Sequence, residues 1–211
     1  LNFIFIALFT YKFHYFVVFT CLKFNNNMVV PSRTLLQYSI CLFLFCFAFL
    51  QPSLKMSLTE VKAICMKSLE KARVGIDEGA IQDGKDFYKY MFGHYPDLRI
   101  YFKGAEQFSP DDVQRSDRFA KQGQRILLAC HILANTYDDP DTFKAYARET
   151  VNRHRQFKME PSLWNAFFTV LTEYLAIKGV GDDATKKAWR EVGKEFSTEC
   201  LAHLKNLGLP H

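Results

Sequence analysis

From residue 56 onward, hydrophobic residues recur at every third or fourth position, and proline, glycine and short polar runs interrupt the repeat. This spacing is typical of amphipathic helices, and no segment of useful length alternates as a strand would. We therefore predict an all-α fold with six longer helices and one or two short ones. The longer helices are predicted to begin near Ser57, Ile81, Arg118, Asp139, Pro161 and Asp182 or Asp183, and the short helical segments at Pro96–Gly104 and Ser109.

Residue types that start and end helices mark several of these boundaries. Ser57-Leu-Thr-Glu60 has the spacing of a capping box, in which two side chains satisfy free N–H groups of the first turn. Asp139 followed by Pro140 is a second start signal, because the carboxylate accepts from free N–H groups and proline has none to satisfy. Gly179 and Gly208 are placed to end the last two helices.

The first 55 residues differ from the rest, since they begin with Leu and hold eleven of the 21 phenylalanines. Three interpretations fit them: untranslated sequence read in frame, a signal peptide that starts at Met28, or a short membrane anchor. We favour the first, which makes Met56 the true start, residues 56–211 the folded domain and the protein cytoplasmic. A signal peptide at Met28 would make it secreted instead.

Charge and cysteine content exclude some classes of function. The formal net charge is +5, but residues 1–55 carry four basic residues and no acidic one, so residues 56–211 are close to neutral. The charge therefore gives no indication of nucleic-acid binding. The folded part contains Cys65, Cys130 and Cys200 without a C-x-x-C pair, which predicts buried free thiols rather than disulfides or a zinc site.

Three polar side chains fall on apolar helix faces. His154 ends the apolar face of the helix that begins at Asp139, so its imidazole is directed at the core. It is either a core histidine bonded to a backbone carbonyl or an axial ligand to a metal or haem iron. Gln122 lies on the face of the helix from Arg118, and Tyr88 is expected to be a buried phenol. Such conflicts with the hydrophobic pattern often mark functional sites.

Four separated motifs together resemble a known family. They are Asp86–Phe92 (DFYKYMF), Pro96–Phe102 (PDLRIYF), Phe119–His131 (FAKQGQRILLACH) and Arg148–His154 (RETVNRH). In this order and at these distances they resemble the globins of nematodes. The resemblance covers essentially Met56 to His211, and it implies the globin fold around a haem pocket, with haem b (iron protoporphyrin IX) as cofactor.

The resemblance also implies roles for single residues. His154 matches the proximal histidine that binds the haem iron, and Phe102 matches the phenylalanine that wedges the haem. Gln122 matches the distal position, and Ile126 matches the apolar residue that crowds the gas ligand. Tyr88 matches the position on the second helix that faces this ligand.

A family of this kind implies reversible dioxygen storage or transport, with carbon monoxide and nitric oxide as further ligands. Hydrogen bonds from Tyr88 and Gln122 to dioxygen predict high affinity, and glutamine, unlike a distal histidine, gains no charge in acid. We expect a carrier rather than an enzyme. The alternatives are a nitric oxide dioxygenase or weak peroxidase that uses a separate reductase, then a haem-based sensor. Both a monomer and a homodimer fit the sequence.

Overall fold

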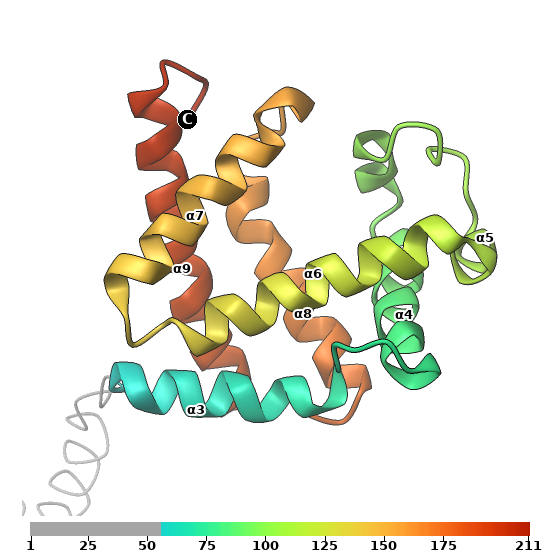
Figure 1. Ribbon diagram of the computed structural model, residues 1–211, viewed down its shortest axis with the longest axis horizontal. Coiled ribbons are helices and arrows are strands. Elements are labelled where there is room, and N and C mark those ends of the chain that lie inside the picture. Colours follow the sequence, from blue (N-terminus) through green and yellow to red (C-terminus); the bar gives the residue numbers. More distant parts are fainter. Residues whose placement is uncertain (1–55) are drawn as a thin grey trace, which may run out of the picture. The chain divides into compact units, whose positions relative to one another are not determined.

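The structure, a computed structural model, describes residues 56–211, and the predictions made for residues 1–55 lie outside them. Within the described residues there is no strand, and the all-α prediction with six longer helices is confirmed (Figure 1). The helices are α3 (Leu58–Ser68), α4 (Glu78–His94), α5 (Pro110–Arg115), α6 (Asp117–Asn135), α7 (Pro140–His154), α8 (Leu163–Ile177) and α9 (Asp183–Asn206). Short 3-10 helices follow three of them: η1 (Leu69–Lys71), η2 (Pro96–Tyr101) and η3 (Arg155–Phe157).

Local capping explains why most helices begin where the sequence predicts. The Asp139 side chain accepts from the Thr142 N–H at 3.2 Å, and Ser57 Oγ accepts from the Glu60 N–H at 3.2 Å. Asp182 caps α9 by accepting from the Thr185 N–H at 2.7 Å. Each of these bonds satisfies one N–H that the first helical turn leaves free.

Two predicted helix starts were displaced. The second helix was expected from Ile81, but α4 begins at Glu78, because the Asp77 carboxylate accepts from the Ala80 N–H at 3.0 Å and so caps the helix. The polar run after Asp77 therefore belongs to the helix. In contrast, α8 begins at Leu163 rather than at Pro161, which lies in the preceding turn.

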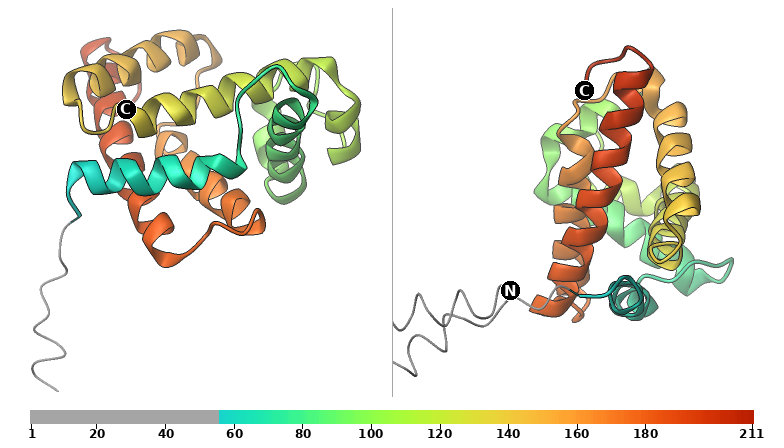
Figure 2. Two further views of the ribbon diagram at one scale, coloured as in Figure 1. Left: turned by 60° about the horizontal axis from the view of Figure 1, so that its bottom comes forward. Right: turned by 90° about the vertical axis from the view of Figure 1, so that its left-hand side faces the viewer.

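The helices pack in crossing pairs rather than in a parallel bundle. α4 packs against α6, α9 packs against α3, α7 and α8, and α3 lies alongside α6 (Figure 2). At the crossing of α4 and α6 the two backbones meet, since a Cβ on Gly123 would lie 2.4 Å from the Gly84 carbonyl carbon. Only glycine permits so close an approach.

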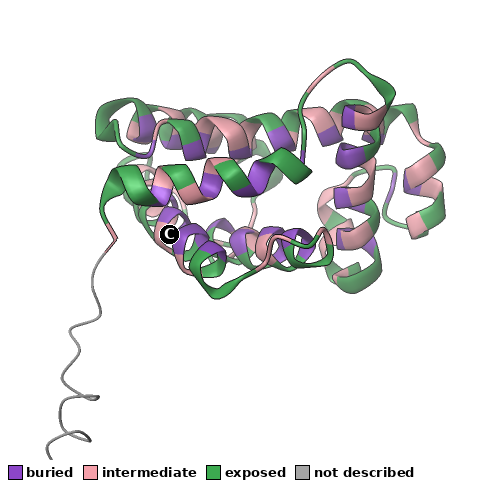
Figure 3. Cartoon of the chain, turned by 90° about the horizontal axis from the view of Figure 1, so that it is seen from below, coloured by how far each residue is buried: buried purple, intermediate pink, exposed green. Residues whose placement is uncertain are grey.

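Buried residues lie on the inward faces of these helices (Figure 3). The two largest fully buried side chains are Trp189 and Tyr174, and both have polar partners: Trp189 Nε1 donates to Ser68 Oγ at 2.9 Å, and the Tyr174 hydroxyl donates to the Asp83 carbonyl at 2.9 Å. The three cysteines of this region are free and buried, as predicted. Among residues 56–211, no helix has the length and apolar character needed to cross a membrane.

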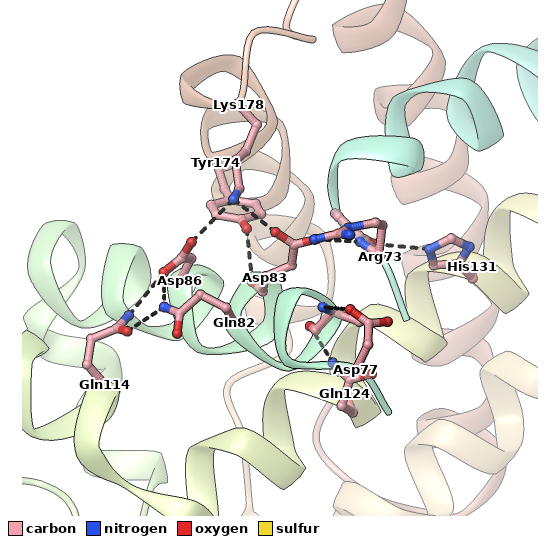
Figure 4. Close-up of polar contacts among 12 residues, drawn as sticks. Arg73, Asp77, Gln82, Asp83, Asp86, Gln114, Gln124, His131, Tyr174 and Lys178 are labelled. Atoms are coloured by element: carbon pink, nitrogen blue, oxygen red, sulfur yellow. Dashed lines mark hydrogen bonds and ion pairs between the residues drawn. The ribbon is translucent and has the colours of Figure 1, made fainter. Parts of the chain in front are cut away.

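A charged cluster anchors the first half of α4 (Figure 4). The buried Asp83 carboxylate accepts from Arg73 Nε at 2.9 Å and from Lys178 Nζ at 3.1 Å, and Lys178 also lies 3.3 Å from Asp86. Burial alone would raise the pKa of Asp83, but the hydrogen bonds from both cations outweigh burial and lower it. Through Asp83 the cluster connects α4 to the end of α8 and to the segment after η1. Asp83 precedes Tyr88 on the same helix.

Candidate functional site

His154 is the last residue of α7, and a hydrogen bond fixes its ring. Phe143, Ala147 and Val151 on the same face are buried, whereas the imidazole itself is only half-buried. Its Nδ1 lies 2.8 Å from the carbonyl oxygen of Thr150. Because a carbonyl only accepts, Nδ1 carries a proton, and in the neutral imidazole Nε2 then keeps a lone pair. This backbone bond is the one a core histidine would make, and it also prepares Nε2 to bind a metal.

Two aromatic rings hold the imidazole from the side. The Trp164 ring centroid lies 5.8 Å from that of His154 at an interplanar angle of 80°, and the Phe157 centroid lies 5.9 Å away at 62°. Trp164 Nε1 is buried without a hydrogen-bond partner in the described chain. The hydrophobic pattern placed Trp164 only on an apolar stripe, and nothing in its spacing distinguished it from a core residue.

Tyr88 lies on α4 among aromatic rings. Only 7% of the residue is exposed, and its ring centroid lies 5.5 Å from that of Phe102 and 5.1 Å from that of Phe119. Burial raises the pKa of the Tyr88 phenol, so its hydroxyl stays protonated and able to donate near neutral pH. No other residue in the described part of the chain forms a hydrogen bond with this hydroxyl.

Phe102 directly follows η2, and Pro96 at the start of η2 turns the chain into this corner. The half-buried Phe102 ring contacts Tyr88, Phe92 and Phe119, with centroid distances of 5.5, 5.2 and 6.0 Å. The structure therefore brings together two of the predicted site residues, Phe102 and Tyr88, from separate segments.

Gln122 and Ile126 lie one turn apart on α6, and both are half-buried. Gly123 and Leu127, their neighbours along the helix, are buried. Gln122 Oε1 accepts a hydrogen bond from Arg118 Nε at 3.2 Å, a contact that sequence reasoning missed. Gln122 thus lies at the edge of the core-facing side of α6.

No hydrogen bond or ring contact within residues 56–211 joins His154 to Tyr88, Phe102, Gln122 or Ile126. Moreover, α6 and α7 are not among the closely packed helix pairs. Among residues 56–211, ring contacts join Tyr88 to Phe102, but no hydrogen bond or ring contact joins either of them to His154, Gln122 or Ile126.

The residues present fit a haem. Residues 56–211 contain no group of three or more His, Cys, Asp or Glu side chains arranged to hold a metal ion. A porphyrin supplies four ligands itself and needs only one more from the chain, which the free Nε2 of His154 can provide.

Comparison with known proteins gives consistent matches. The sequence model of the family named Globin matches residues 85–200. A globin-like protein of Caenorhabditis elegans is 54% identical over 158 residues, which are 75% of this chain and 99% of that protein. A myoglobin of Ascaris suum is 53% identical over 149 residues, or 70% of this chain and 97% of that protein. The solved structure of the C. elegans globin-like protein GLB-1 has a TM-score of 0.73 and 55% identity, and the match covers 74% of this chain and 99% of that one.

Proposed function

The chain belongs to the globin family, and from this premise we propose that it is a haem protein that binds dioxygen reversibly, for storage or transport. The observation that carries the proposal is the hydrogen bonding of His154, whose Nδ1 lies 2.8 Å from the Thr150 carbonyl oxygen and whose Nε2 makes no hydrogen bond within residues 56–211. A relative that is 53% identical is named a myoglobin, which supports a carrier.

Haem b, when bound, would supply the iron chemistry of reversible dioxygen binding. His154 Nε2 would hold this iron, and the Thr150 carbonyl keeps the imidazole in the required tautomer and orientation. Trp164 and Phe157 limit rotation of the ring from the side. We assign Phe102 and Ile126 to the apolar wall of the pocket, because both are half-buried beside fully buried neighbours.

We assign the hydroxyl of Tyr88 and the amide of Gln122 as the two donors to dioxygen. The Tyr88 hydroxyl has no hydrogen-bond partner in the described chain, so it is available for a ligand. In a dry pocket each bond contributes about 1–2 kcal/mol, and the pair raises affinity by roughly 10²-fold. This gain should appear mainly as slow dissociation. Carbon monoxide accepts hydrogen bonds more weakly, so both donors favour dioxygen over it.

Repeated oxygenation tests the proposal. The full chain is loaded with hemin, reduced, and cycled between air and argon while its visible spectrum is recorded. A carrier returns to the same deoxygenated spectrum in every cycle. Rapid oxidation in air, together with sustained consumption of nitric oxide when a reductant is added, would instead identify a nitric oxide dioxygenase.

A further inference from the structure

The amide of Gln122 can adopt two orientations, and only one of them presents hydrogen-bond donors to a ligand. A glutamine side chain ends in a carbonyl oxygen that accepts and an NH₂ group that donates, and rotation by half a turn exchanges them. In this structure Oε1 accepts from Arg118 Nε at 3.2 Å. The NH₂ group is consequently left free for a different acceptor.

Arg118 is itself held at two further points. Its guanidinium donates to the Lys103 carbonyl at 2.8 Å and lies 5.7 Å from the centroid of the Phe119 ring. Lys103 directly follows Phe102, so Arg118 bridges the corner after η2 and the first turns of α6. The neighbouring Glu106 carboxylate accepts from the Gly104 N–H at 2.8 Å, and it interacts with Arg118 through charge alone in the described contacts.

We propose that Arg118 is a positioning residue that keeps Gln122 Oε1 turned away from the ligand and its NH₂ group turned toward it. This inference rests on the proposed function, in which Gln122 donates to dioxygen. The planar guanidinium suits this task, since separate N–H groups serve the amide and the carbonyl at the same time. Gln122 follows Arg118 by four positions, a spacing that brings their side chains together on one face of α6.

Removal of Arg118 frees the amide to rotate. If both orientations become equally populated, the donating fraction halves and dioxygen dissociates about twofold faster. If the inverted orientation dominates, the effect approaches that of removing the amide altogether, roughly five- to 30-fold. The Arg118→Ala variant is therefore expected between these limits.

A double-mutant cycle tests the proposal on the haem-loaded full chain. Dioxygen dissociation is measured by stopped flow for wild type, Arg118→Ala, Gln122→Leu and the double variant. The C–O stretching frequency of the carbon monoxide form, which responds to nearby donors, gives a second readout that a loss of stability alone would not move. Arg118→Ala should accelerate dissociation at least twofold and raise this frequency in the presence of Gln122, but change neither in the Gln122→Leu background.

Two further variants serve as controls. Arg118→Lys keeps the positive charge but lacks the planar guanidinium, whose separate N–H groups reach the amide and the carbonyl together. It should therefore behave like Arg118→Ala. Lys121→Ala removes another exposed cation of α6, which makes no hydrogen bond to Gln122 in the described chain. It should leave the C–O frequency unchanged.

The outcomes distinguish the donor role of Gln122 from the positioning role of Arg118. If Gln122→Leu leaves dissociation unchanged, the donor role of the amide in the proposed function is wrong, and the inference falls with it. If Gln122→Leu accelerates dissociation but Arg118→Ala does not, only the positioning role is overturned. Equal effects of Arg118→Ala in both backgrounds would also overturn it, because Arg118 would then act without Gln122.

Discussion

Tyr88→Phe separates ligand binding from folding more cleanly than any other single change in this chain. The substitution removes one oxygen atom and keeps the ring that packs against Phe102 and Phe119. Because the hydroxyl has no partner within the described chain, its removal leaves no protein group unsatisfied. Loss of a hydroxyl that makes no hydrogen bond to the protein costs little stability, so the apoprotein should unfold at the same denaturant concentration as wild type or at a higher one.

The effect on ligand binding should be opposite and larger. A hydrogen bond from a phenol in a dry pocket contributes about 1–2 kcal/mol, which corresponds to roughly five- to 30-fold faster dioxygen dissociation. Burial raises the pKa of Tyr88, so the wild-type hydroxyl stays protonated and this ratio should not change between pH 6 and pH 9.

Stopped-flow displacement of dioxygen measures the rate, and urea unfolding of the apoprotein measures the stability. Carbon monoxide dissociation is the internal control and should change much less. If the dioxygen rate stays within about twofold of wild type, the hydroxyl has no part in binding. A destabilised apoprotein would show instead that the phenol has a structural partner.

Other features of the structure predict changes in stability and reactivity. Asp83→Asn should destabilise the fold at pH 7 by about 1–3 kcal/mol, because Arg73 loses its carboxylate partner and Lys178 keeps only Asp86. The pKa of Asp83 is lower in the folded state than in the unfolded chain. Its contribution to the free energy of unfolding is therefore complete above the unfolded pKa near 4 and is lost as the pH falls through the folded pKa. Urea unfolding of Asp83→Asn at a series of pH values should lack this pH-dependent contribution. Gly123→Ala places a methyl group 2.4 Å from the Gly84 carbonyl carbon, so α4 and α6 must separate, and thermal unfolding should show a loss of about 2 kcal/mol or more. Burial raises the pKa of the Cys130 thiol to about 12, so a thiol reagent should modify Cys130 at pH 8 only after denaturation.

Local signals in the sequence were sufficient to locate most helices. Asp139 and Pro140 predicted the start of α7. Helical spacing then placed His154 on the same face as the buried residues of this helix. The start of α4 was missed because Asp77 stands in a polar run, where a cap and a loop residue look alike. The resemblance to globins added the grouping of Tyr88 with Phe102, which the ring contacts now show.

Contacts between distant segments could not be predicted in this way. The hydrogen bond from Arg118 to the Lys103 carbonyl depends on the path of the chain after η2, which no periodicity encodes. The same holds for Asp83, whose partners lie ten residues before it and 95 residues after it. Trp164 reaches His154 only because α8 follows α7 after a short turn.

The central claim is that His154 Nε2 is the protein's ligand to the haem iron. Absorption spectra of ferrous wild type and His154→Ala, each loaded with one equivalent of hemin and reduced under argon, test it most directly. The wild type should give the spectrum of haem with one imidazole ligand, and the variant should lose that spectrum and regain it when free imidazole is added. A variant whose spectrum matches wild type without added imidazole would contradict the account, since another residue would then hold the iron.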